Sequence, residues 1–255
     1  MKKRMNWTML CSGVLLWSGL SACMGEDGTI IRFGSQAGVV RLAEGKQIVL
    51  RNGMRILAPQ LDTLQIGDGD CCLVDFQMNY DNQPDSLQNI WHADWLTYRP
   101  VDLHALTTLV EDDTVTTRPD EHFLDFSIER GGCVEGRLFL YLEYSRHYQS
   151  QVDEYVMFCD PDPAERHPAA TDSARLVHRL YLRSFGPIAA NDSVMESVVL
   201  PEAFLVEELF RRAEMAGEDT LHIQITYPTG FNADSSRYNW TYSDVFSIPL
   251  AGEER

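Results

Sequence analysis

Short segments in which apolar and polar residues alternate fill most of the chain after residue 28. A period of two is typical of strands that bury one face, and turn residues separate these segments. The strongest turn signal is Asn52-Gly53 between two apolar runs, which predicts a β-hairpin. A second turn at residues 68–70 precedes a long predicted strand that begins at Cys71. We therefore predict an all-β fold.

One stretch, residues 202–216, has a helical period instead. Pro201 suits the first turn of a helix, and Gly217 suits its C-terminal cap. Phe204 and Leu209 fall on one apolar stripe, and the opposite side of the stretch is charged. This pattern predicts a single surface helix that lies on a sheet.

The composition changes at residues 111–120, where acidic residues, threonines and a proline leave little to bury. We predict an acidic linker here; a long acidic loop inside one domain is the alternative. The linker divides the chain into an N-terminal β-domain at 29–110 and a C-terminal β-domain at 121–255, which carries the helix.

The N-terminus has the layout of a bacterial export signal. A positively charged start precedes an apolar core that is shorter than the roughly 18–20 residues needed to span a bilayer. Small residues then lead to a cysteine, and the ending Leu20-Ser21-Ala22-Cys23 resembles the lipobox of bacterial lipoproteins. An uncleaved membrane anchor is the alternative.

The lipobox resemblance implies that residues 1–22 are removed as a signal peptide and that Cys23 carries a lipid such as palmitate. Residues 23–28 then tether the body of the protein to a membrane. The stretch MGED at 24–27 resembles the signals that send Bacteroidetes lipoproteins to the cell surface; an ordinary polar tether is the alternative. We expect an outer membrane lipoprotein of the bacterial cell envelope.

The net charge of −17 limits the classes of partner. A nucleic-acid surface needs a cationic stripe, so we expect no nucleic-acid partner. The same charge disfavours electrostatic adhesion to anionic lipid, and the lipid anchor supplies the membrane contact instead.

Four cysteines follow Cys23. Cys71 and Cys72 are adjacent on a predicted strand and should point to opposite faces. A disulfide between Cys133 and Cys159 is possible in an oxidising envelope, although four cysteines allow three pairings. Burial as small apolar residues is the alternative.

Several stretches resemble the NigD-like lipoproteins of Bacteroidetes. In the first half they are LRNGMRIL at 50–57 and GDG at 67–69, which leads into CLVDF at 72–76; in the second half they are GRLFLYL at 136–142 and VFSIPL at 245–250. The resemblance implies an OB-like barrel followed by an immunoglobulin-like β-sandwich. It supplies no catalytic residues.

Six Asp–Ser/Thr–apolar triplets resemble the O-glycosylation sites of the same phylum. Thr114 and Ser193 lie in predicted loops and are the better candidates.

The chain lacks a nucleophile elbow, a phosphate-binding loop and histidines paired at metal-ligand spacing. Acidic clusters at 111–113 and 160–162 lack the alternating spacing of a calcium loop, and solvated loop charge is the default interpretation. We therefore predict no catalytic residue, no metal ligand and no cofactor.

An aromatic cluster near the C-terminus is the candidate ligand site. It consists of Phe231, Tyr238, Trp240 and Tyr242 among amide and hydroxyl side chains. Such rings suit a sugar ring or a protein partner. Rings that cover one end of the sandwich are the alternative.

Three functions follow from these observations. The first is a non-catalytic envelope lipoprotein with a binding or protective role, which is not an enzyme. The second is an immunity-like or inhibitor protein for a basic partner, which the acidic charge would suit. The third is a surface glycan hydrolase, although no carboxylate pair is singled out by the sequence.

Overall fold

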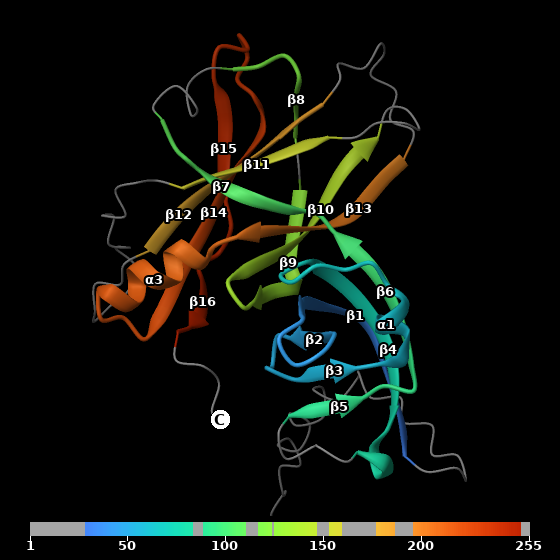
Figure 1. Cartoon of the computed structure of the whole chain (residues 1–255). Coiled ribbons are helices and arrows are strands. Elements are labelled where there is room, and N and C mark those ends of the chain that lie inside the picture. Colours follow the sequence, from blue (N-terminus) through green and yellow to red (C-terminus); the bar gives the residue numbers. More distant parts are fainter. Residues whose placement is uncertain are drawn as a thin grey trace, which may run out of the picture.

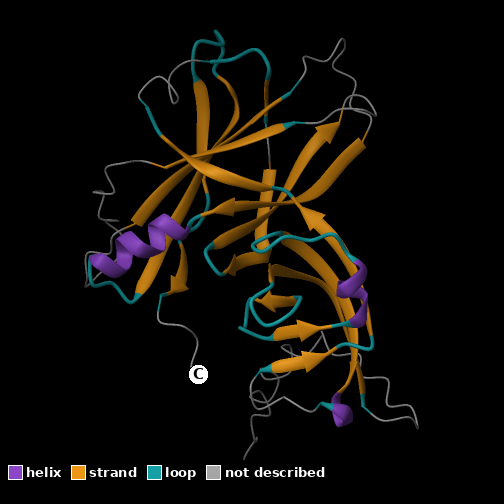
Figure 2. Cartoon of the chain, viewed as in Figure 1, coloured by secondary structure: helices purple, strands orange, loops and turns teal. Residues whose placement is uncertain are grey.

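The computed structural model describes residues 29–83, 89–110, 117–123, 125–146, 153–159, 177–186 and 196–250. Strands dominate these residues and form two sheets (Figures 1 and 2), so the predicted all-β fold is confirmed. The helical elements are α1 (Pro59–Thr63), the 3-10 turn η1 (Tyr80–Asn82) and α3 (Glu207–Met215). None of the helices described has the length and apolar character that a membrane crossing requires.

The first sheet is six-stranded, in the order β5-β3-β2-β1-β4-β6, and only β3 and β5 run parallel. Its strands are β1 (Ile30–Arg41), β2 (Gln47–Leu50), β3 (Arg55–Leu57), β4 (Cys71–Asn79), β5 (Ile90–His92) and β6 (Trp95–Val101). Strand β1 carries a bulge between Phe33 and Gln36, which increases its local twist.

The predicted hairpin joins β2 to β3. Gly53 has φ +72°, a left-handed conformation that side-chain-bearing residues rarely adopt. The Leu50 N–H donates to the Met54 carbonyl at 2.8 Å, and the Gly53 N–H donates to the Leu50 carbonyl at 2.9 Å. The Asn52-Gly53 prediction is confirmed.

Alternate residues of β4 serve two different cores. Cys72, Val74 and Phe76 lie inside the first sheet with apolar residues of the other strands. Cys71 and Leu73 point the other way, into a separate cluster. The two adjacent cysteines therefore face opposite sides of the sheet, as predicted.

The second sheet is ten-stranded, in the order β15-β14-β12-β11-β7-β13-β10-β9, with β16 paired to β14 and β8 paired to β12. Its strands are β7 (Leu103–Thr108), β8 (Glu121–His122), β9 (Asp125–Val134), β10 (Arg137–Arg146), β11 (Glu154–Cys159), β12 (Val177–Phe185), β13 (Glu196–Leu205), β14 (Thr220–Phe231), β15 (Tyr238–Tyr242) and β16 (Phe246–Pro249).

The two halves of the second sheet enclose one core. Residues of β10 and β13 on one side meet residues of β11, β12 and β14 on the other, and α3 adds Leu209 and Ala213. This is a sandwich-like arrangement. The pairs β7–β11, β7–β13 and β12–β14 are parallel, unlike the antiparallel sheets of an immunoglobulin sandwich.

The position at which the chain changes sheet differs from the predicted linker at 111–120. Strand β7 already belongs to the second sheet, because Leu106 pairs with Met157 and Leu103 pairs with Ala203. The change therefore occurs at Asp102, between β6 and β7. Of the predicted linker, residues 111–116 lie outside the described residues.

The helix predicted at 202–216 is wrong at its start and right at its end. The stretch 201–205 is the last part of β13, where Phe204 pairs with Leu138 of β10. Helix α3 begins only at Glu207. At its end the Glu218 N–H donates to the Ala213 carbonyl, and Gly217 has φ +74°, which is the glycine cap that was predicted.

A third cluster of buried residues joins the two sheets. It contains Val39, Cys71, Leu73 and Val101 from the first sheet and Val134, Phe139, Tyr141 and Ala203 from the second. At its margin Arg41 bridges Glu135 at 2.7 Å and Asp68 at 3.2 Å. The contact therefore combines apolar burial with partly exposed ion pairs.

Candidate functional site

Five aromatic rings form a continuous series on the outer side of the second sheet; we call it the aromatic strip. The ring centroids are 5.0 Å apart for Phe123 and Phe231, 5.5 Å for Phe231 and Tyr238, 5.4 Å for Tyr238 and Trp240, and 5.6 Å for Trp240 and Tyr181. Such edge and stacked contacts are favourable beyond the area that the rings bury.

The structure brings three of the four predicted ligand-site residues together in this strip: Phe231, Tyr238 and Trp240. Tyr238 is buried, whereas Phe231 and Trp240 are partly exposed. The fourth residue, Tyr242, is 70% exposed. It lies two residues beyond Trp240 on β15 and so shares its face of the strand.

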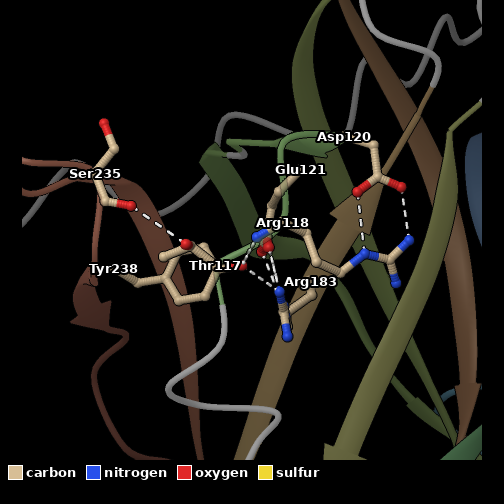
Figure 3. Close-up of polar contacts among 7 residues, drawn as sticks. All are labelled: Thr117, Arg118, Asp120, Glu121, Arg183, Ser235 and Tyr238. Carbon is tan, nitrogen blue, oxygen red and sulfur yellow. Dashed lines mark hydrogen bonds and ion pairs between the residues drawn. The ribbon is translucent and has the colours of Figure 1, made fainter.

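A buried ion pair lies beneath Tyr238 (Figure 3). The side chains of Arg183 and Glu121 are 3% and 0% exposed. The Arg183 Nε donates to both Glu121 carboxylate oxygens, at 3.0 and 3.1 Å. Its Nη2 contacts the Glu121 carboxylate and the Tyr238 hydroxyl. A buried guanidinium is tolerated when it has a counter-charge and its N–H groups are hydrogen-bonded, as they are here.

Two aromatic faces enclose the same guanidinium. Arg183 lies 4.8 Å from the ring centroids of both Phe185 and Tyr238. On Phe185 a second guanidinium, that of Arg118, lies at 3.9 Å. Burial, followed by the hydrogen bond with Glu121, raises the pKa of Tyr238 to about 12. The Tyr238 hydroxyl therefore stays protonated at neutral pH.

Arg118 forms a more exposed, forked pair with Asp120. Its Nε donates to Asp120 Oδ1 at 3.0 Å and its Nη2 to Oδ2 at 2.6 Å. These hydrogen bonds lower the pKa of Asp120 and raise that of Arg118. The pair orients Arg118 over the Phe185 ring.

Residues 117–123, which we call the strap, are attached to the sheet along their length. The Arg118 N–H donates to the Tyr238 hydroxyl at 2.8 Å, and the Gly186 N–H donates to the Asp120 carbonyl at 2.9 Å. Farther along, His122 Nδ1 lies 2.8 Å from Asp153 Oδ2. The strap and the buried ion pair together hold Tyr238, the middle ring of the aromatic strip, in place.

Sequence reasoning missed the strap and its partners. Glu121 and Arg183 are 62 residues apart, so no local pattern links them. The available signal is that Arg183 follows Leu182 within a strand rich in apolar residues. A charge in such a strand often marks a buried pair.

The predicted Cys133–Cys159 disulfide is not formed in the structure. In the order of the second sheet, β7, β13 and β10 lie between the strands that carry the two cysteines. Burial raises the pKa of Cys133 to about 12, which keeps its thiol protonated. Both residues pack against the core of the second sheet, as the alternative interpretation proposed.

Three further predicted residues, Cys23, Thr114 and Ser193, lie outside the described residues. Within the part of the chain that is described, no group of three or more His, Cys, Asp or Glu residues is arranged to hold a metal ion.

The N-terminal part of the chain is similar to one known domain family. Residues 28–86 match the model of a family described as a lipoprotein OB domain. No curated protein sequence matches the chain.

Solved structures resemble this chain in fold over a larger part of its length than the domain family does. An uncharacterized protein from Parabacteroides merdae ATCC 43184 is 19% identical, with a TM-score of 0.69, over 86% of this chain and 99% of that chain. A candidate lipoprotein from Bacteroides fragilis NCTC 9343 is 12% identical, with a TM-score of 0.55, over 88% of this chain and 100% of that chain. A NigD-like immunity protein from Bacteroides caccae ATCC 43185 is 9% identical, with a TM-score of 0.48, over 87% of this chain and 97% of that chain.

The expected relation to Bacteroidetes lipoproteins is confirmed at two levels. The Parabacteroides and Bacteroides fragilis structures share the fold across almost the whole described chain. Residues 28–86 match the model of a lipoprotein OB domain.

Proposed function

We propose that this chain is a non-catalytic outer membrane lipoprotein that binds a glycan at the exposed end of the aromatic strip. The binding surface consists of Tyr181, Trp240 and Tyr242. The observation that carries the proposal is that the aromatic strip runs from Tyr238, buried above an ion pair, to the partly exposed Trp240, with the exposed Tyr242 on the same face of β15.

The strand register brings the rings of this surface together. Thr226 pairs with Tyr181 on one side and with Tyr242 on the other, so these three residues share one row and one face. Trp240 adjoins the row because its ring meets that of Tyr181 edge to face. Exposed aromatic rings suit the apolar C–H faces of a pyranose.

The fixed position of Tyr238 favours the same interpretation. The strap and the Arg183–Glu121 ion pair hold Tyr238, and Tyr238 contacts Trp240. A binding surface that is already ordered by Tyr238 loses little conformational entropy when a ligand binds.

The test is binding of the lipidated protein, purified in detergent, to an array of bacterial and host surface glycans. We expect capture of a defined glycan, and we expect Trp240→Ala to weaken that binding about ten-fold or more, because the ring supplies the stacking surface. The matched control is Tyr80→Ala, which removes a 53% exposed ring from η1, the turn that follows β4 of the first sheet. Absence of glycan capture, or equal capture by Trp240→Ala, contradicts the proposal.

The charge of the chain favours a second candidate, an immunity-like protein that binds a basic partner. A net charge of −17 accelerates association with a cationic protein and makes it dependent on salt. Binding of a purified cationic toxin domain that weakens with salt and survives Trp240→Ala would support this candidate over the glycan.

A further inference from the structure

The outer face of the first sheet is only partly used in the contact with the second sheet. Near the junction, Ala37, Leu73, Cys71 and Val101 pack in the cluster that joins the two sheets. Farther along the same strands this face becomes polar, and an indole lies on its edge strand: Trp95, the first residue of β6, is 50% exposed.

The strand register places Trp95 in a row with two polar side chains. Gln77 of β4 pairs with Trp95 of β6 on one side and with Arg32 of β1 on the other. The Arg32 Nε donates to Gln77 Oε1 at 2.8 Å. This hydrogen bond fixes the guanidinium over the sheet, and within the described chain its two Nη atoms have no protein partner.

The next row on this face is Asp75–Thr97, and a second guanidinium reaches it from Arg99, which pairs with Leu73 one row farther along. Arg99 Nη2 donates to Ser35 Oγ at 2.9 Å and lies 3.4 Å from Asp75 Oδ2. Asp75 also accepts the Ser35 N–H at 2.6 Å. Ser35 has φ +49° and lies in the bulge of β1, so strained backbone is used to hold this arrangement.

These two rows form a small cationic and aromatic surface on an acidic protein. Arg32 and Arg99 are exposed, and the neighbouring carboxylate of Asp75 is already engaged by Arg99 and by a backbone N–H. An indole face beside two oriented guanidinium groups complements a ring that bears a carboxylate.

We propose that this surface, made by Arg32, Gln77, Trp95 and Arg99, is a second binding site, which takes a carboxylate-bearing sugar such as a hexuronate residue of an acidic glycan. The sugar ring lies on the Trp95 indole, and its carboxylate accepts hydrogen bonds from the arginines. Gln77 and Asp75 orient these arginines and offer acceptors to the hydroxyl groups. The site is separate from the aromatic strip and does not depend on the function proposed for it.

The test is isothermal titration of the lipidated protein in detergent with hexagalacturonate, and with cellohexaose as the neutral probe. We expect hexagalacturonate to bind about ten-fold or more tightly than cellohexaose, and we expect Trp95→Ala and Arg99→Leu each to weaken it about ten-fold. Arg99→Lys, which keeps the charge but loses the planar fork, should retain intermediate affinity.

Two control variants on α3, away from the first sheet, match these changes. Arg211→Leu removes a guanidinium that is 67% exposed on α3, and Met215→Ala removes a 74% exposed apolar side chain. Both should bind hexagalacturonate as the unmodified protein does. Circular dichroism of every variant separates lost binding from lost folding.

Three results would overturn the proposal. The first is an absence of hexagalacturonate binding. The second is binding that Trp95→Ala leaves intact; if Trp240→Ala abolishes it, the sugar belongs to the aromatic strip instead. The third is equal competition by hexaglutamate, which would assign the surface to acidic peptides.

Discussion

Glu121 and Arg183 form an ion pair in which both side chains are almost completely removed from solvent. Glu121 belongs to β8 within the strap and Arg183 to β12, so the pair fastens the strap beside the strand with which β8 pairs. Tyr238 completes the arrangement from β15. The exposed aromatic surface of the second sheet therefore packs, through Tyr238, on a buried ion pair.

Replacing Glu121 with Gln should lower the free energy of unfolding by about 3–5 kcal/mol, because Arg183 then stays buried without a counter-charge. Urea denaturation followed by circular dichroism measures this change. The matched control is Asp120→Asn, which breaks a pair whose side chains are 49% and 33% exposed and should cost less than about 1 kcal/mol. Equal losses for the two variants would show that the buried pair does not hold the strap.

The stability of the fold should fall in mild acid because of His178. Burial, followed by the charges of Arg212 and His222, lowers the pKa of this histidine. Below its unfolded pKa of about 6.5 the unfolded chain binds a proton that the folded chain resists, so stability is lost as the pH falls toward the folded pKa.

The variant His178→Leu should lose that part of the pH dependence. Melting temperatures at pH 8 and pH 5 measure it, and the pH 8 value separates any packing defect from titration. If the variant and the unmodified protein lose the same stability between these two pH values, His178 is not the group responsible.

Gly38→Ala should destabilise the first sheet by about 1–3 kcal/mol through overpacking. A Cβ at this position would lie 2.4 Å from Ile48 Cγ2 and 3.2 Å from the Val49 carbonyl oxygen. Gly230→Ala is the control, since no atom lies within 4 Å of the added Cβ in β14. Thermal melts compare the two variants, and an unchanged melting temperature for Gly38→Ala would contradict the observed closeness of β1 and β2.

Cys23→Ala should release the protein from membranes, because the lipobox resemblance implies that this cysteine carries the lipid. Fractionation of cells together with metabolic labelling by a palmitate analogue measures both effects. Cys11→Ala, which changes the apolar core of the export signal and leaves Cys23 in place, should remain labelled and bound. Membrane retention of Cys23→Ala without lipid label would indicate an uncleaved anchor.

Features that depend on local chemistry were predictable from the sequence. Asn52-Gly53 can adopt the tight turn of a hairpin whatever surrounds it, and Gly217 can cap a helix through its own φ angle. The opposite orientation of Cys71 and Cys72 follows from the pleat of one strand alone.

Features that depend on distant residues were not predictable. The stretch 201–205 fits a helical stripe as well as a strand, and its pairing with β10, more than fifty residues earlier, selects the strand. Leu103–Thr108 likewise joins the second sheet through partners far along the chain. The aromatic residues of the candidate site were found, but the ion pair that supports them was not, because its two members come from separate segments.

The most direct test of the central claim is a titration of the detergent-purified lipoprotein with the glycan that it captures, carried out in parallel on the Trp240→Ala and Glu121→Gln variants. The account predicts that Trp240→Ala stays folded and binds about ten-fold or more weakly, and that Glu121→Gln loses affinity as well as stability. Unchanged affinity in a folded Trp240→Ala variant would contradict the claim that the aromatic strip is the binding surface.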